Sequence, residues 1–186
     1  MIFAAYKAQK DDYPVNAAFS LEGVGSPHML FIAACLVLVV CLRSFAGLAL
    51  NFPWKGAGYW GTALACAVVF GKAAGGFIAD KFGLFKTTYV SLAAASLLFF
   101  LPQVPVAGVA AMLLFNMTMP VTLWAMAKIM PGAKGFAFGL LTFGLFLGFL
   151  PVYLGVGISQ HGAWIFALIS AASLAILLTG LRRAKL

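Results

Sequence analysis

Residues 29–52 read MLFIAACLVLVVCLRSFAGLALNF, and this run decides the class of the protein. Arg43 is its only charged residue. A helix of this length, at about 1.5 Å per residue, is long enough to cross a hydrocarbon core roughly 30 Å thick. The whole chain has the same character, with 64% hydrophobic residues, 9% charged residues and a mean hydropathy of +1.06. This composition excludes a soluble domain and predicts that lipid surrounds the chain.

Six apolar stretches, bounded by glycine, proline and charged residues, account for most of the 186 residues. They predict membrane spans at 29–52, 58–78, 87–101, 104–127, 135–157 and 162–181. Backbone polar groups in lipid must be satisfied within their own segment and no barrel-like alternation is visible, so the spans are expected to be helices. The predicted fold class is an all-α polytopic membrane domain at 28–186. The polar segment before it, 1–27, is interpreted as a cytoplasmic tail or the remnant of a central loop.

The distribution of lysine and arginine among the loops predicts the orientation. One side of the predicted spans carries only Lys55, whereas the other carries Lys7, Lys10, Lys81, Lys86, Lys128, Lys134, Arg182, Arg183 and Lys185. Positively charged loops are retained in the cytoplasm, so both termini are expected there, in a multi-pass protein of the inner or plasma membrane. The basic residues stand singly between apolar segments. We therefore attribute the net charge of +8 to topology and expect no nucleic-acid partner.

A glycine- and charge-rich motif joins the second and third predicted spans. It reads Gly76-Phe-Ile-Ala-Asp80-Lys81-Phe-Gly83-Leu-Phe-Lys86. Gly83 permits a tight turn, Gly76 permits close approach of two helices, and Asp80 can form charge-assisted bonds with the flanking cations. The pattern resembles the cytoplasmic loop signature that the major facilitator superfamily carries between the second and third helices of each six-helix half. A generic positively charged turn is the alternative.

The resemblance implies an architecture and a function. Residues 28–186 look like the C-terminal half of such a transporter, built as a 3+3 inverted repeat, with a solute site between the two halves near the bilayer midplane. Full members have about twelve helices, so a second six-helix half is implied, either as a separate chain or as a second copy. The implied function is alternating-access transport of a small solute. A six-helix membrane scaffold or assembly subunit without its own solute pathway is the alternative.

Polar residues inside the predicted spans are the candidate solute contacts. Arg43 lies about 21 Å along its helix from Met29. An intramembrane charge costs at least about 2.5–3.5 kcal/mol on insertion scales, so such a residue either serves a function or snorkels to an interface. Lys72 can snorkel more easily, toward the cytoplasm. The resemblance places the first and fourth spans at the transport cavity, which implies substrate contacts for Arg43, Asn116 and Thr122, and Arg43 favours an anionic solute.

Glycines recur at intervals of four in two spans. Gly71 and Gly75 lie in the second span, and the fifth carries two further pairs, Gly135 with Gly139 and Gly144 with Gly148. Small residues at this spacing let helix backbones approach closely. The resemblance suggests that these faces meet the missing half and are partly exposed in this chain. Packing within the six helices is the alternative.

Catalytic and metal-binding patterns are weak in this sequence. Asp80 is the only acid after Glu22, which leaves no paired carboxylates within the spans. His28 and His161 fall at opposite membrane faces and cannot share a metal. The cysteines, which lie inside apolar runs, are interpreted as small buried hydrophobes: Cys35, Cys41 and Cys66. No enzymatic activity, metal or cofactor is expected.

Overall fold

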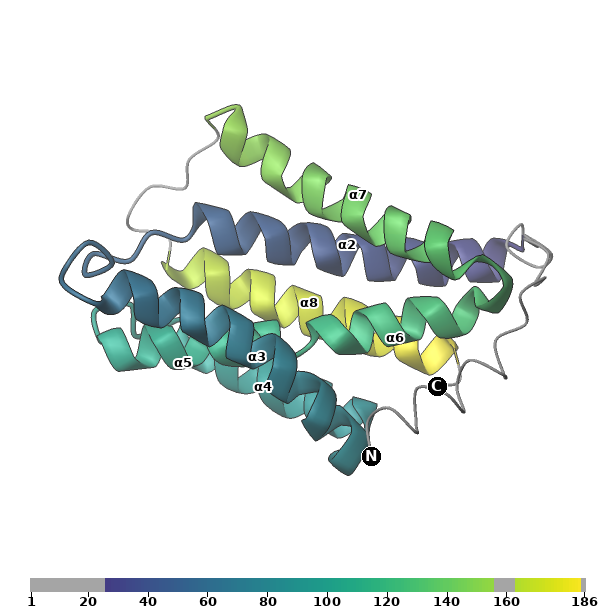
Figure 1. Ribbon diagram of the computed structural model, residues 1–186, viewed down its shortest axis with the longest axis horizontal. Coiled ribbons are helices and arrows are strands. Elements are labelled where there is room, and N and C mark those ends of the chain that lie inside the picture. Colours follow the sequence, from purple (N-terminus) through teal and green to yellow (C-terminus); the bar gives the residue numbers. More distant parts are fainter. Residues whose placement is uncertain (1–25, 156–162, 185–186) are drawn as a thin grey trace, which may run out of the picture.

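The computed structural model describes residues 26–155 and 163–184, and this part of the chain is helical without any strand. The helices are α2 (Pro27–Ala49), α3 (Trp60–Phe82), α4 (Leu84–Leu98), α5 (Pro105–Asn116), α6 (Met119–Ile129), α7 (Lys134–Tyr153) and α8 (Ala163–Arg183), with a short 3-10 turn at Pro131–Ala133 (Figure 1). The prediction of an all-α fold is confirmed.

Five segments are long and apolar enough to cross a membrane. Four of them are α2, α3, α7 and α8, and the fifth is the pair of helices α5 and α6 taken as one segment. The remaining helix, α4, has 15 residues and a length of about 22 Å, which is short for a span. The short span was foreseen at 87–101, and the observed helix begins and ends three residues earlier. By length and composition the chain is a multi-pass membrane protein.

A single residue, Gly83, separates α3 from α4. Its φ of +90° is a backbone conformation that only glycine adopts without strain, which confirms the predicted tight turn. The N–H of Gly83 donates to the carbonyl of Ala79 (2.9 Å), and the N–H of Thr87 donates to the carbonyl of Gly83 (3.1 Å). The second helix therefore runs on to Phe82, beyond the predicted boundary at 78. Asp80 and Lys81 belong to its last turn and not to a loop.

The fourth span is broken in the middle, next to Pro120. Proline has no N–H, so the intrahelical bond to the carbonyl of Asn116 cannot form. Helix α5 ends at that residue and α6 begins at Met119. The hydroxyl of Thr118 satisfies one carbonyl at the break by donating to that of Phe115 (3.2 Å). Irregular backbone is tolerated at membrane depth where it is enclosed by protein, and Thr118 is fully buried.

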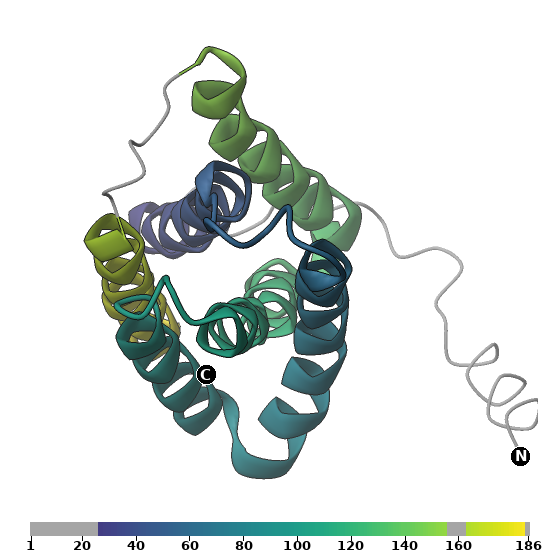
Figure 2. The same cartoon turned by 90° about the vertical axis from the view of Figure 1, so that its left-hand side faces the viewer.

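The largest helix–helix contacts form a pattern that is preserved when the first three spans are exchanged with the last three. Helix α2 packs on α7 and α8, and α5 packs in the same way on α3 and α4. The remaining large contact, between α4 and α8, maps onto itself under the exchange. Figure 2 views the bundle from the end that carries the α2–α3 loop and shows α7 beside α2.

Two pairs of glycines hold the packing together and will be called the glycine seams. In the first seam, Gly71 and Gly75 of α3 are so close to the backbone of Leu113 and Met117 that an added Cβ would overlap the carbonyl groups. In the second, Gly148 of α7 meets the carbonyl of Cys41 in the same way.

Gly144, which completes the second seam, would place its Cβ 3.2 Å from Cγ1 of Val37 and 3.3 Å from the carbonyl oxygen of that residue. All four seam glycines are buried. The expectation that they face a missing half is therefore wrong, because they bring α3 close to α5 and α7 close to α2. Gly135 and Gly139 do stay exposed, with nothing within 4 Å of an added Cβ.

Successive spans run in opposite directions, so the described cations separate by end. The end with Gly83 carries Lys81, Lys86, Lys128, Lys134, Arg182 and Arg183, and the opposite end carries Lys55. This separation is the one that the loop count anticipated. The cytoplasmic location of the first end stays a prediction.

A candidate anion site between α2, α3 and α5

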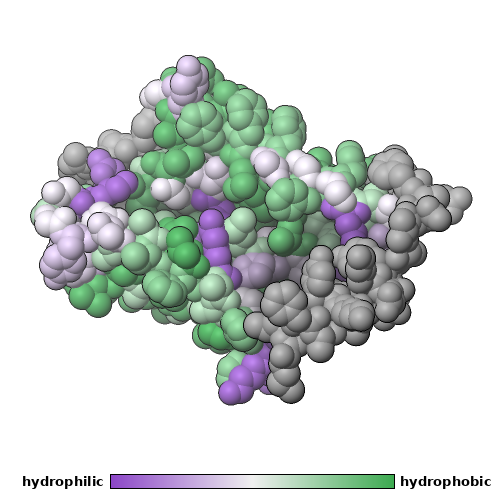
Figure 3. All heavy atoms as spheres, in the orientation of Figure 1, coloured by the Kyte–Doolittle hydropathy of each residue, from purple (hydrophilic) through white to green (hydrophobic). Residues whose placement is uncertain are grey.

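A cavity of about 370 Å³, which we call the Arg43 cavity, lies among five helices near the middle of the bundle. Arg43 and Ser44 reach it from α2, Lys72 from α3, and Asn116 from the end of α5. Met119 of α6 and Leu145 of α7 complete its wall. Figure 3 shows hydrophilic atoms interrupting a largely hydrophobic surface between α7 and α3. Its volume is in the range of small-molecule sites.

Arg43 is the more buried of the two cations that line this cavity. Its side chain is 6% exposed, and its Nη2 donates to Oγ1 of Thr118 at 2.9 Å. This is the one hydrogen bond it makes with the described residues, although a guanidinium has five N–H donors. None of its nitrogens is among the fully enclosed polar atoms that lack a partner, which are Thr87 Oγ1, Thr88 Oγ1 and Ser173 Oγ. The remaining donors therefore border the open volume of the cavity.

No carboxylate neutralises the two cations within the described residues. Asp80 is the only acid in 26–155 and 163–184, and it lies eight residues beyond Lys72, about 12 Å farther along α3. Arg43 is a buried cation without a counter-ion, which is costly, and Lys72 adds an exposed cation on the wall of the same cavity. Together they make the site attractive to anions. A guanidinium binds carboxylate, sulfonate or phosphate groups through paired N–H donors, while an ammonium adds a mobile point charge.

Asn116 and Thr122 differ in their access to the Arg43 cavity. The Nδ2 of Asn116 donates to the carbonyl of Met112 at 2.8 Å, and the side chain lines the cavity. The hydroxyl of Thr122 donates to the carbonyl of Met119 at 2.7 Å, and this residue is not among those that line the cavity. The structure thus brings Arg43 and Asn116 together, and leaves Thr122 in the packed interior of α6.

The motif after the second span borders a different cavity, of about 430 Å³, at the Gly83 end. Gly76, Asp80 and Gly83 line it together with Pro120 and Trp124 of α6. Lys81 and Lys86 are exposed outside it, with Nζ of Lys81 5.5 Å from the ring centroid of Phe82. The carboxylate of Asp80 is exposed as well and so is available to groups outside this chain.

Equivalent positions of the two glycine seams face each other across the Arg43 cavity. Lys72 follows the first glycine of its seam, as Leu145 follows Gly144 of the other. The second glycine of each seam, Gly75 or Gly148, meets the carbonyl of Met117 or Cys41. Two residues farther along the chain lie Met119 and Arg43, respectively. These four residues, Lys72, Leu145, Arg43 and Met119, all line the cavity.

Two contributors were missed by sequence reasoning. Thr118 is not among the residues that the sequence singles out, and its bond to Arg43 joins residues 75 positions apart. Lys72, for which the sequence predicts easier snorkelling, is exposed and also lines the same cavity as Arg43. Its position next to Gly71, on a helix that must approach its neighbour closely, was a signal for this placement.

In the part of the chain that the structure describes, no three side chains of His, Cys, Asp or Glu gather as metal ligands. His28 is exposed at the start of α2, and His161 lies outside the described residues. The comparisons with known proteins add no further assignment, because no family model, curated protein or solved structure matches this chain.

Proposed function

We propose that this chain is one six-helix half of a secondary transporter of the major facilitator type, most like the C-terminal half, and that it moves a small anionic solute by alternating access. The observation that carries the proposal is the Arg43 cavity, whose wall includes the intramembrane cations Arg43 and Lys72 and no carboxylate. Intramembrane charges of this kind mark solute pathways.

The helix packing supports the inverted-repeat architecture. Exchange of the first three spans with the last three preserves the main helix pairs. It also brings Gly71 and Gly75 into correspondence with Gly144 and Gly148, with the same spacing of four residues. In inverted-repeat transporters the solute site lies at the interface between repeats. The Arg43 cavity fits this rule, since equivalent residues of the two seams form its wall.

A second six-helix half is part of the proposal. The cavity draws on five helices of this chain and is open on one side, where a separate chain or a second copy would complete the pathway. The exposed Asp80 at the Gly83 end would bind groups of that partner, in the role that the resemblance implies for the Gly76–Lys86 motif. The cation distribution favours an inner or plasma membrane location with both termini in the cytoplasm.

Accessibility of single cysteines to water separates a transporter half from a six-helix scaffold. In a variant with Cys35, Cys41 and Cys66 replaced by alanine, Lys72→Cys should react rapidly with a membrane-impermeant maleimide in proteoliposomes. Phe70→Cys is the matched control, because Phe70 is 64% exposed on the same helix and should face lipid. Equal, slow labelling at both positions would favour the scaffold.

A further inference from the structure

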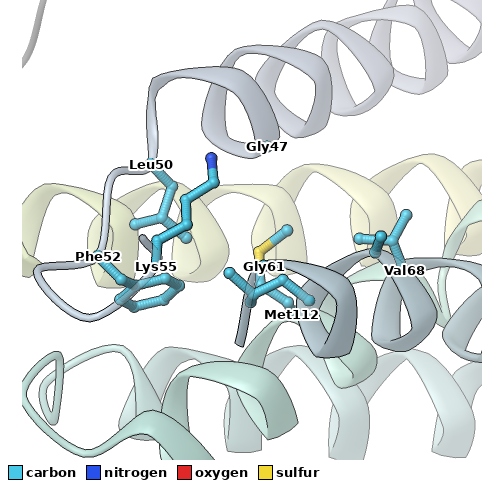
Figure 4. Close-up of a pocket in the computed structure, with 9 residues that line it drawn as sticks. Gly47, Leu50, Phe52, Lys55, Gly61, Val68 and Met112 are labelled. Carbon is cyan, nitrogen blue, oxygen red and sulfur yellow. The ribbon is translucent and has the colours of Figure 1, made fainter. Parts of the chain in front are cut away.

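A second cavity, of about 220 Å³, lies between the last turn of α2 and the first turn of α3 (Figure 4). It is distinct from the Arg43 cavity but shares three of its lining residues, Gly47, Val68 and Met112. The two cavities are therefore adjacent sections of one groove, which we call the α2–α3 groove. Its outer section ends at Lys55.

Lys55 is the only described cation at this end of the bundle. Its side chain extends across the cavity toward α2, with the nitrogen on the side of Gly47 (Figure 4). The backbone below it is part of a turn, in which the N–H of Lys55 donates to the carbonyl of Phe52 at 3.1 Å. The charge thus stands at the mouth of the groove.

The loop that carries Lys55 is anchored to α5 and to the loop before it. Trp54 donates its Nε1–H to the carbonyl of Pro102 at 2.8 Å, and its ring stacks on Phe52 with centroids 4.6 Å apart. Both rings pack on Gly108, where an added Cβ would overlap Trp54 and stand 3.0 Å from Phe52. Such anchoring holds Lys55 over the groove and distinguishes it from a charge on a free loop.

The cations of the groove lie at increasing depth. Arg43 stands six residues before the end of α2, about 9 Å along the helix, and Lys72 stands twelve residues after the start of α3, about 18 Å along it. Among the described residues no acid lies at this end or in the groove. A cleft lined by one sign of charge concentrates ions of the opposite sign.

We propose that the α2–α3 groove is the admission path by which a small anion reaches the Arg43 cavity from the Lys55 end, with Lys55 as the capturing cation and Arg43 and Lys72 as the receiving pair. The ligand class is a small solute that carries a carboxylate, sulfonate or phosphate group. The inner half of the path rests on the proposed function, whereas the role of Lys55 does not follow from it.

The test compares an anionic and a cationic thiol reagent at one position of the groove. Gly47 lines both cavities and has open space where a Cβ would stand, so Gly47→Cys is free of steric conflict. In the cysteine-free background and in phosphatidylcholine vesicles, the sulfonate reagent MTSES should react faster than the ammonium reagent MTSET. Lys55→Gln should lower the ratio of the two rates on the order of fivefold, and Arg43→Gln should lower it as well. Lys134→Gln, at the opposite end, should leave it unchanged.

The outcomes separate the two proposals. A ratio that falls with Arg43→Gln but not with Lys55→Gln would overturn the admission path and leave the proposed site intact. If the ratio falls with Lys55→Gln but not with Arg43→Gln, Lys55 captures anions at the mouth of the groove, and the proposed anion site at Arg43 is contradicted. If Gly47→Cys reacts with neither reagent, the groove is closed to water and the path is refuted. Loss of MTSES reactivity on adding phosphatidylglycerol would assign the groove to a lipid headgroup and refute the path as well.

Discussion

The two glycine seams have the same backbone design and different side chains. Gly75 on Met117 and Gly148 on Cys41 each press a helix backbone against a carbonyl of its neighbour. Beside these contacts, however, the α2 and α3 side of the Arg43 cavity carries a guanidinium and an ammonium, while equivalent positions on α6 and α7 carry Met119 and Leu145. The two seams thus share one kind of backbone packing, and the charges beside them differ.

This difference separates what the fold requires from what a solute site requires. The close backbone contacts are needed on both sides, since α2–α7 and α3–α5 are among the main helix pairs. The cations are not needed for packing, because apolar residues, Met119 and Leu145, take the equivalent places beside the other seam. Under the proposed function, the charges on one side, at a depth where they are costly, serve the anionic solute.

The largest expected effect is loss of the folded bundle when either seam is filled. Gly75→Leu and Gly148→Leu each force a side chain into a neighbouring backbone, which should cost about 3 kcal/mol or more. Folded yield and thermal unfolding in detergent measure this. Gly139→Leu is the matched control, because nothing lies within 4 Å of a Cβ there. Normal folding of both seam variants would show that the helices can part at these contacts.

Replacing Arg43 by the residue at the equivalent position should remove anion preference and keep the fold. In Arg43→Met the desolvation cost of the charge disappears, so the midpoint of thermal unfolding should not fall. The MTSES-to-MTSET rate ratio at Gly47→Cys should fall on the order of tenfold. Arg43→Lys should give an intermediate ratio, since it keeps the charge but loses the paired donors. A marked drop in stability with an unchanged ratio would make Arg43 a structural residue.

Much of the fold was predictable from sequence because it depends on local signals. The apolar runs predicted the helices, and Gly83 predicted the tight turn between α3 and α4. The sequence does not predict which side of a helix faces lipid and which packs on other helices, because hydrophobic residues cover all sides of a helix in the membrane. The glycine seams were for this reason wrongly expected to face outward.

The site was predictable only in part, for the same reason. Arg43 stood out because a charge at its depth is rare. Its partner Thr118 and its neighbour Lys72 come from other helices, and their meeting depends on the rotation of three spans. Lys55 lies in a loop, where a single cation carries no signal until the groove beside it is known.

A smaller effect is expected from the bond that links Arg43 to the break in the fourth span. Thr118→Val removes the acceptor of Nη2 and should destabilise the protein by about 1–3 kcal/mol, because a buried donor loses its partner. In the Arg43→Met background the same change should cost less, since no donor is left unpaired. A double-mutant cycle of unfolding free energies measures the coupling. Additive effects would contradict the hydrogen bond as a stabilising contact.

The smallest effect concerns the anchored mouth of the groove. Trp54→Phe retains an aromatic ring over Gly108 but removes the donor to the carbonyl of Pro102, which should cost about 1 kcal/mol. Thermal unfolding measures the loss, and Trp164→Phe serves as a control because Trp164 is exposed at the start of α8. Equal shifts in both variants would show that the anchor contributes nothing specific.

The most direct test of the account moves one charge across the cavity to its equivalent position. Lys72→Leu should lower the MTSES-to-MTSET rate ratio at Gly47→Cys, and adding Leu145→Lys should restore most of it, because both residues line the same cavity from equivalent places on the two seams. The predicted result is therefore recovery of anion preference in the double variant, with folded yield unchanged. A ratio that stays as low in the double variant as in Lys72→Leu would contradict a single anion site formed beside both glycine seams.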